Sequence, residues 1–257
     1  MRVALADVGR CGRLDLVFAE RDGRTALQHS YCEVPFKITR PLSGPPDGRA
    51  HLMLMHCTAG LFGGDRIELT VRVERGARVR LTQQSATRVH PSDGRLAVQC
   101  SRIQVEREAE LEMLLEPVIP FEESRLSQQT LIEMDAGARL IYWEGLMAGR
   151  VGRGELWTFD ELSSETKLML EDRLLFLDRL RLQPTGPLVS ARWGMGTGTY
   201  SGTGLYVGEH AARFADALRE AMPAAGVDLL TDNFAATRVV TSSGPEFHRC
   251  REIFATR

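Results

Sequence analysis

The sequence predicts an all-β fold of stacked strand layers, with one or two α-helices near the C-terminal end. Apolar and polar residues alternate strictly from Ile67 to Leu81, as in strands with one buried face. A strand–turn–strand pattern occurs three times, and helical patterning is confined to the last 50 residues or so. At 257 residues the chain is long enough to bury a large core. We expect a single domain over residues 1–257, strand-rich over 1–208 and helix-containing over 209–257.

The first third of the chain contains short alternating segments separated by turn residues. Strands are expected at 14–19, 25–33 and 51–56, and the Pro- and Gly-rich segment 40–49 is expected to be a loop. The stretch HCTAGLFGGD, residues 56–65, then leads into the alternating segment. We interpret it as a strand end followed by a tight glycine turn.

The alternating segment begins a repeat. Residues 71–81, 103–113 and 132–142 share one pattern of alternating apolar positions around a central turn, at spacings of 32 and 29 residues. Gly76 and Gly137 stand where a tight turn needs a positive φ, whereas the middle copy has Glu108, for which we expect a different turn type. The pattern predicts three β-hairpins stacked on one another.

The remaining elements follow from periodicity. Strands are expected at 96–100, 155–162 and 166–182, and the Gly- and Thr-rich segment 191–208 is expected to form a bent strand pair. Residues 209–222 carry an apolar stripe at helical spacing that ends before Pro223. A second helix is expected at 245–254, because Pro245 suits a first helical position.

Composition narrows the function classes. The net charge of −2 gives no electrostatic footprint for nucleic acid. The odd number of scattered cysteines, without a CxxC pair, favours neither a disulfide framework nor a closed zinc site; they are Cys11, Cys32, Cys57, Cys100 and Cys250. The sequence shows neither a signal peptide nor a stretch of 18 apolar residues, so we expect no membrane contact and a cytoplasmic location.

The stretch 56–65 holds potential metal ligands, but its pattern argues against a tight site. A strand follows it, whereas phosphate loops rely on a helix N-terminus, so nucleotide binding is not expected. His51 and His56 lie five residues apart on a predicted strand and therefore face opposite sides, and Cys57 diverges from His56. Whether these three residues ever contact metal stays open. Asp65 could add a further ligand, or it could only cap the turn.

A second glycine-rich stretch spans residues 142–162. Its glycines surround Arg150 and Arg153 and it continues into Glu155. Such a run is typical of a bent connection in which backbones approach closely, and its charged residues could also line a polar crevice. The chain has no GxSxG nucleophile elbow, and the spacing of its carboxylates marks none of them for acid–base chemistry.

Together these stretches resemble the family of the urease accessory protein UreD, called UreH in some systems. The matching pieces occur in the family's order at 34–42, 59–90, 109–124 and 137–157, and the resemblance covers roughly residues 30–182. The sequence departs from the family at His90, where a tyrosine is usual, and at Cys57-Thr58, where Ser or Pro is more frequent. The residues that match family motifs are Gly63, Gly64, Asp65, Thr82, Gln83, Thr87, Gly149, Arg150, Gly154 and Glu155.

The resemblance implies a two-layered all-β fold and a non-enzymatic role in urease maturation. Members of the family bind apo-urease and the accessory protein UreF, which recruits the nickel-carrying GTPase UreG. A polar passage through the UreD-like protein is thought to carry nickel to the urease active site. No tightly bound cofactor is implied.

Transit requires weak sites, because a closed metal site, with about 10–16 kcal/mol of binding free energy, would release its ion too slowly. Isolated carboxylates attract a divalent cation while leaving water bound to it. The candidate nickel-transit residues are Asp65, Glu144, Glu155 and Asp178.

Two alternatives remain open at this point. One is a β-sandwich or solenoid hydrolase that uses His56, Asp65 and Glu155 as acid–base groups, which would have to converge in a blind apolar pocket. The other is a paralogue that keeps the fold but serves a different assembly. Transit instead predicts a polar tunnel that is open at both ends.

Overall fold

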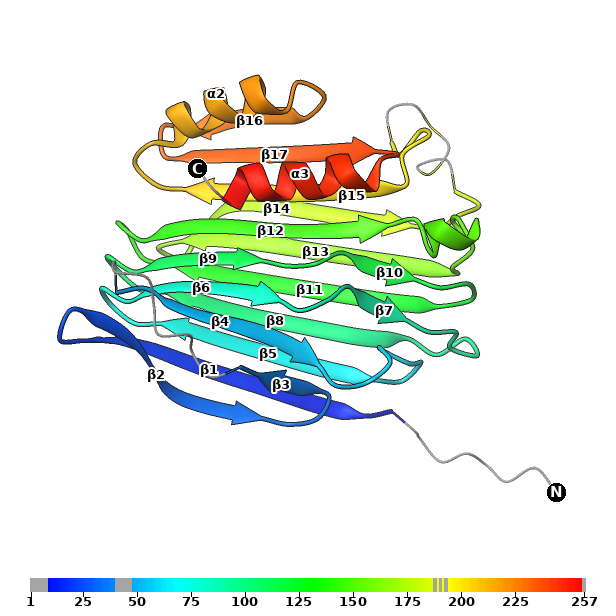
Figure 1. Cartoon of the computed structure of the whole chain (residues 1–257), viewed down its shortest axis with the longest axis horizontal. Coiled ribbons are helices and arrows are strands. Elements are labelled where there is room, and N and C mark those ends of the chain that lie inside the picture. Colours follow the sequence, from blue (N-terminus) through cyan, green and yellow to red (C-terminus); the bar gives the residue numbers. More distant parts are fainter. Residues whose placement is uncertain (1–8, 40–47, 187–188, 190, 192–193, 256–257) are drawn as a thin grey trace.

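The computed structural model describes residues 9–39, 48–186, 189, 191 and 194–255. In this part of the chain two β-sheets lie face to face, with the helices α2 and α3 near the C-terminal end of the stack (Figure 1). The prediction of a β-dominated, two-layered fold with C-terminal helices is confirmed. Most of the loop expected at 40–49 lies outside the described residues.

Among the described residues, the first sheet has seven strands, in the spatial order β14 (Arg173–Leu182), β13 (Glu161–Leu170), β11 (Arg125–Met134), β8 (Ala97–Val105), β5 (Arg66–Val73), β1 (Cys11–Arg21) and β2 (Arg24–Cys32). The second sheet has, in order, β16 (Gly226–Thr231), β17 (Phe234–Thr241), β15 (Tyr200–Val207), β12 (Arg139–Met147), β9 (Glu110–Leu114), β6 (Arg78–Gln83), β4 (Ala50–His56) and β3 (Phe36–Ile38), and the short strands β7 (Thr87–Val89) and β10 (Val118–Pro120) join it beside β12. The helices with bounds among the described residues are η1 (Val151–Arg153), α2 (Ala211–Ala221) and α3 (Gly244–Ala255).

The predicted repeat is real, but its units are arches rather than hairpins. β5 and β6 belong to different sheets, and the turn between them carries the chain from one sheet to the other. β5 pairs in parallel with β8, and β6 pairs in parallel with β9, so each strand bonds to the equivalent strand of the next repeat. The hairpin pairing was wrong because alternation reports which face of a strand is buried and not which strand lies beside it.

The turns of the three arches share one backbone conformation. Gly76 and Gly137 have φ of 72° and 80°, as predicted. Glu108 has φ of 64°, so the prediction of a different turn type in the middle copy was wrong. The crossing between sheets requires the left-handed conformation in every copy, and a non-glycine residue adopts it at a cost of about 1 kcal/mol.

Several boundaries differ from the prediction. Residues 155–160 form a loop rather than a strand, and the segment 166–182 contains a turn, with positive φ at Glu171 and Asp172, between antiparallel strands β13 and β14. In place of a bent strand pair at 191–208, the described residues contain only β15, which pairs with β12 and with the unpredicted β17. A glycine-rich composition fits a loop as well as a strand, so the strand boundaries in these segments are decided by pairing with strands distant in the sequence.

Two cores follow from this arrangement. The larger lies between the sheets and is lined by inward-facing aliphatic residues of both. The smaller lies between the outer face of the second sheet and helices α2 and α3, and contains Trp143, Phe214, Phe247 and Phe254. The helices therefore cover the sheet that contains β12 and β15 (Figure 1).

Candidate functional site: a polar cavity between the sheets

The inward faces of the first sheet become polar halfway along the strands. Ser101, Thr130 and Thr166 are Cα partners across β8, β11 and β13, and Asp178 of β14 pairs with Thr166. On each of the first three strands, the next residue on the same face toward the C-terminus is a buried aliphatic one, such as Ile103, and the preceding one is polar and also lines the cavity, such as Gln99. The result is a row of hydroxyl groups that runs across the sheet and ends at a carboxylate.

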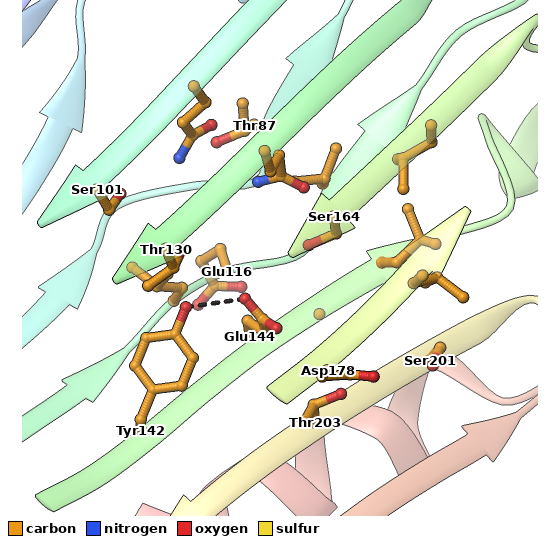
Figure 2. Close-up of a pocket in the computed structure, with 18 of the residues that line it drawn as sticks. Thr87, Ser101, Glu116, Thr130, Tyr142, Glu144, Ser164, Asp178, Ser201 and Thr203 are labelled. Carbon is orange, nitrogen blue, oxygen red and sulfur yellow. Dashed lines mark hydrogen bonds between the residues drawn. The ribbon is translucent and has the colours of Figure 1, made fainter. Parts of the chain in front are cut away.

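A second polar row faces the first from the other sheet. Glu144 of β12 pairs with Thr203 of β15, which pairs in turn with Arg238 of β17. Between the two rows lies a cavity of about 60 Å³, which is large enough to hold water. Figure 2 shows the side chains of both sheets converging on this space, including Asp178 beside Thr203.

Glu144 is the most deeply placed carboxyl group of the cavity. It accepts hydrogen bonds from the Tyr142 hydroxyl at 2.8 Å (dashed in Figure 2) and from the Thr166 hydroxyl at 3.0 Å. Burial raises the pKa of Glu144, since the charged form is poorly solvated there, although both hydrogen bonds oppose that effect. No arginine or lysine forms an ion pair with it in the described part of the chain.

Two other carboxylates of the cavity pair with arginines from the C-terminal elements. Arg238 of β17 donates to Asp178 and thereby joins the two sheets. Arg251 of α3 contacts Glu116, with 3.0 Å between Nη2 and Oε1, and also donates to the Leu114 carbonyl at 3.1 Å. Glu116 lies in the link between β9 and β10, where the strand is interrupted.

The polar space continues toward His56. A smaller cavity of about 20 Å³ contains His56 and shares four lining residues with the first, among them Gln99 and Ser101. His56 Nδ1 and Gln99 Oε1 are buried and have no hydrogen-bond partner among the described residues. Buried polar atoms of this kind are usually satisfied by water or an ion. Burial also lowers the pKa of His56, so the neutral imidazole is favoured.

His51 and Cys57 lie apart from this space, as their spacing predicts. His51 contacts the Thr82 hydroxyl at 3.1 Å between Nε2 and Oγ1, and Cys57 is exposed just beyond the end of β4. Gln83 and Thr87 do line the cavity, where the Gln83 amide donates to the Thr87 hydroxyl at 2.9 Å.

Asp65 holds the glycine turn and does not line the cavity. Its two carboxylate oxygens accept backbone N–H groups of Arg10 at 2.9 Å and Phe62 at 2.8 Å. Gly63 approaches Ser92 so closely that an added Cβ would lie 2.5 Å from the Ser92 carbonyl oxygen, and Gly64 has φ of 90°. The GGD sequence therefore provides a close backbone contact, a left-handed residue and a cap.

Glu155 is likewise engaged in a local contact. It accepts from Arg150 Nε at 2.6 Å and from the Glu122 backbone N–H at 2.8 Å. Gly149 has φ of 140°, and an added Cβ there would lie 2.5 Å from the Glu155 carbonyl oxygen. Gly154 has φ of 73° and ends η1. Arg150, Glu155 and these glycines together hold the bent connection in place.

Several matched motif segments, distant in sequence, meet at one rim of the stack. Phe62 stacks on His90 with 4.4 Å between ring centroids, and His90 meets Phe121 edge-on at 5.0 Å. The guanidinium carbon of Arg150 lies 4.5 Å from the Phe121 ring centroid. These residues come from successive turns of the stack.

The structure thus brings together Glu144 and Asp178, two of the four carboxylates predicted for nickel transit. The hydrolase alternative requires His56, Asp65 and Glu155 to converge in one pocket. In the described part of the chain these three residues do not share a pocket. Glu116, Arg238 and Arg251 were missed. The sequence does contain one sign of the cavity, because a polar residue interrupts the apolar face in the middle of the inward-facing strands, as in LSQQTLIEM. That sign can be used only when the inward-facing side of each strand is known.

Two further findings apply to the described residues. No group of three or more His, Cys, Asp or Glu residues lies close enough to hold a metal ion. None of the helices in this part of the chain has the length and apolar character needed to span a membrane.

Fold and site together define a two-layered β-protein with a carboxylate-containing polar cavity between its sheets. The model of the family described as UreD urease accessory protein matches residues 10–256. The chain therefore belongs to the UreD urease accessory protein family.

Curated relatives named "Urease accessory protein UreD" support this assignment. The chain is 35% identical to the protein of Lysinibacillus sphaericus over 69% of its own length and 66% of that relative. It is 34% identical to the Cupriavidus necator protein over 82% of the chain and 73% of the relative, and 35% identical to the Deinococcus radiodurans protein over 82% and 76%. The matched part thus spans about two thirds to three quarters of these relatives. Membership supports a role in urease maturation, and the accessory-protein names point to a non-catalytic one.

Proposed function

We propose that this chain is a cytosolic scaffold that binds apo-urease and UreF, and through UreF the GTPase UreG, and that nickel passes through its interior to the urease active site. The observation that carries the proposal is the facing pair of polar rows. They place Glu144 and Asp178 on opposite walls of one cavity, among hydroxyl and amide groups.

The chemistry of this lining suits a divalent cation in transit. Carboxylate, hydroxyl and amide oxygens replace lost water ligands without forming a closed site. Conduction needs several such positions that bind weakly and in succession. Glu116 provides a third carboxylate on the same cavity, and His56 a nitrogen ligand on the adjoining one. The contacts of Asp65 and Glu155 favour a structural role for both residues.

The scaffold role is tested by expressing urease with and without this chain, together with UreF and UreG. We expect the nickel content and the activity of urease to fall sharply in the absence of the chain. Undiminished nickel incorporation would refute the role. Pull-down of UreF, UreG and apo-urease on the tagged chain tests the partners directly.

The route is tested by Glu144→Gln, which keeps the shape of the side chain and removes its charge. The matched control is Glu133→Gln, because Glu133 lies on the outer face of the first sheet, where Arg102 Nε donates to it at 2.9 Å. We expect reduced nickel delivery in the first variant alone, with UreF binding intact in both. Equal delivery by the two variants would exclude passage past Glu144.

A further inference from the structure

Two arginines form ion pairs with carboxylates at the margins of the polar cavity. The Arg238 side chain is 40% exposed and yet lines the cavity, so it lies between solvent and the interior, where it pairs with Asp178. Arg251 pairs with Glu116 at the interrupted strand between β9 and β10, and their side chains are 16% and 18% exposed. Both arginines belong to β17 and α3, the last two elements of the described chain.

The charges of the cavity nearly balance in this arrangement. Glu116 and Asp178 are each neutralised by an arginine, and Glu144 remains as the single carboxyl group without a cationic partner there. A fixed guanidinium beside a carboxylate repels a divalent cation that approaches the same oxygens. It also occupies the carboxylate oxygens that such an ion would use as ligands.

We propose that Arg238 and Arg251 are charge latches that control the access of divalent cations to the cavity. Each guanidinium holds a carboxylate until an ion, or a movement of the C-terminal elements, displaces it. Each arginine is then the internal counter-ion of a carboxylate, and when the guanidinium moves away a divalent cation can bind to that carboxylate. This inference rests on the proposed function, because it concerns the regulation of the same cavity.

Metal affinity distinguishes a charge latch from an ion pair that only stabilises the fold. Removing a purely stabilising ion pair lowers stability and leaves the affinity for metal unchanged. A latch that is removed leaves Asp178 or Glu116 free inside a polar cavity, and the affinity for a divalent cation rises. Arginine is well suited to this role, since its planar fork matches a carboxylate and its charge is permanent.

The test is calorimetric titration of the purified full chain with NiCl2. We expect Arg238→Gln and Arg251→Gln each to bind Ni²⁺ at least about tenfold more tightly than the wild type, while Arg238→Lys, which keeps the charge, stays near the wild type. The matched control is Arg219→Gln on α2, because Arg219 pairs with the exposed Asp216 and does not line the cavity. Arg219→Gln is expected to bind Ni²⁺ as the wild type does.

The double variant Asp178→Asn/Arg238→Gln locates the ion. We expect it to return to the weak binding of the wild type, and tight binding that persists there would overturn the proposal. Wild-type affinity in folded Arg238→Gln and Arg251→Gln, with folding checked by circular dichroism, would also overturn it. If Arg238→Gln does not fold, Arg251→Gln decides the question, because it acts at a separate carboxylate.

Failure of the latch and failure of the proposed function give different results. Tighter nickel binding by the variants, combined with urease that matures without this chain, supports the latch and refutes the maturation role. Unchanged nickel binding, combined with urease that depends on the chain, refutes the latch and supports the role.

Discussion

Helix α3 packs on the second sheet through its buried side chains Phe247, Cys250 and Phe254, and we predict that truncating Phe247 strongly destabilises the protein. Phe247 is fully buried, with ring centroids 5.9 Å from Trp143 and 5.6 Å from Tyr200. It lies against the two glycines of neighbouring strands, Gly145 and Gly202, where an added Cβ would approach the ring to 2.5 Å and 3.1 Å. Those glycines create the flat surface that the ring fills.

The magnitude for Phe247→Ala follows from this packing. Truncating a fully buried Phe costs about 3–5 kcal/mol, and the rigid sheet beneath cannot collapse into the space. For a chain of 257 residues, 1 kcal/mol corresponds to about 2 °C in Tm, so we expect a decrease of about 6–10 °C. Because α3 also carries Arg251, the same change loosens the contact with Glu116.

The assay is equilibrium unfolding in urea, followed by tryptophan fluorescence, with Tm from circular dichroism. Phe62→Ala is the matched control, because the Phe62 side chain is 41% exposed and we expect a loss below about 1 kcal/mol. A loss for Phe247→Ala that is no larger than for Phe62→Ala would refute the packing argument and the inferred attachment of α3.

Three further predictions concern single residues. Asp65→Ala leaves two backbone N–H groups without their acceptor, so we expect the free energy of unfolding in urea to fall by about 1–3 kcal/mol. Asp65→Asn keeps one acceptor oxygen, so we expect a smaller loss. The raised pKa of Glu144 means that its contribution to stability is full below its unfolded pKa, near 4.5, and is lost as the pH rises through the folded value. The stability of Glu144→Gln relative to the wild type should therefore increase from pH 4 to pH 8, and a constant difference would contradict a raised pKa of Glu144 in the folded state. Gly137→Ala should cost about 1 kcal/mol purely through its positive φ, because nothing lies within 4 Å of the added Cβ; an unchanged urea midpoint would show that the turn relaxes.

Much of the fold can be read from local patterns. The alternation over Ile67–Leu81, the repeated turn with Gly76 and Gly137, and the apolar stripe of α2 each depend on residues close together in the chain. Such patterns predict which positions are buried and where the chain turns, and they also carry the family motifs. The sequence alone was thus sufficient for the β-dominated class, for the repeat and for the resemblance to UreD.

Pairing and the interior were decided only by the tertiary structure. The same alternation permits a hairpin or an arch, and the choice of arch turned β5 and β6 into facing walls of one interior. Register then aligned Thr130 with Thr166 and Thr166 with Asp178, and brought Arg238 from 60 residues away to the Asp178 carboxylate. The sequence determined which residues of a strand share a face, because side-chain direction is local. Which of them meet is set by contacts between distant strands, and for that reason the cavity became visible only in three dimensions.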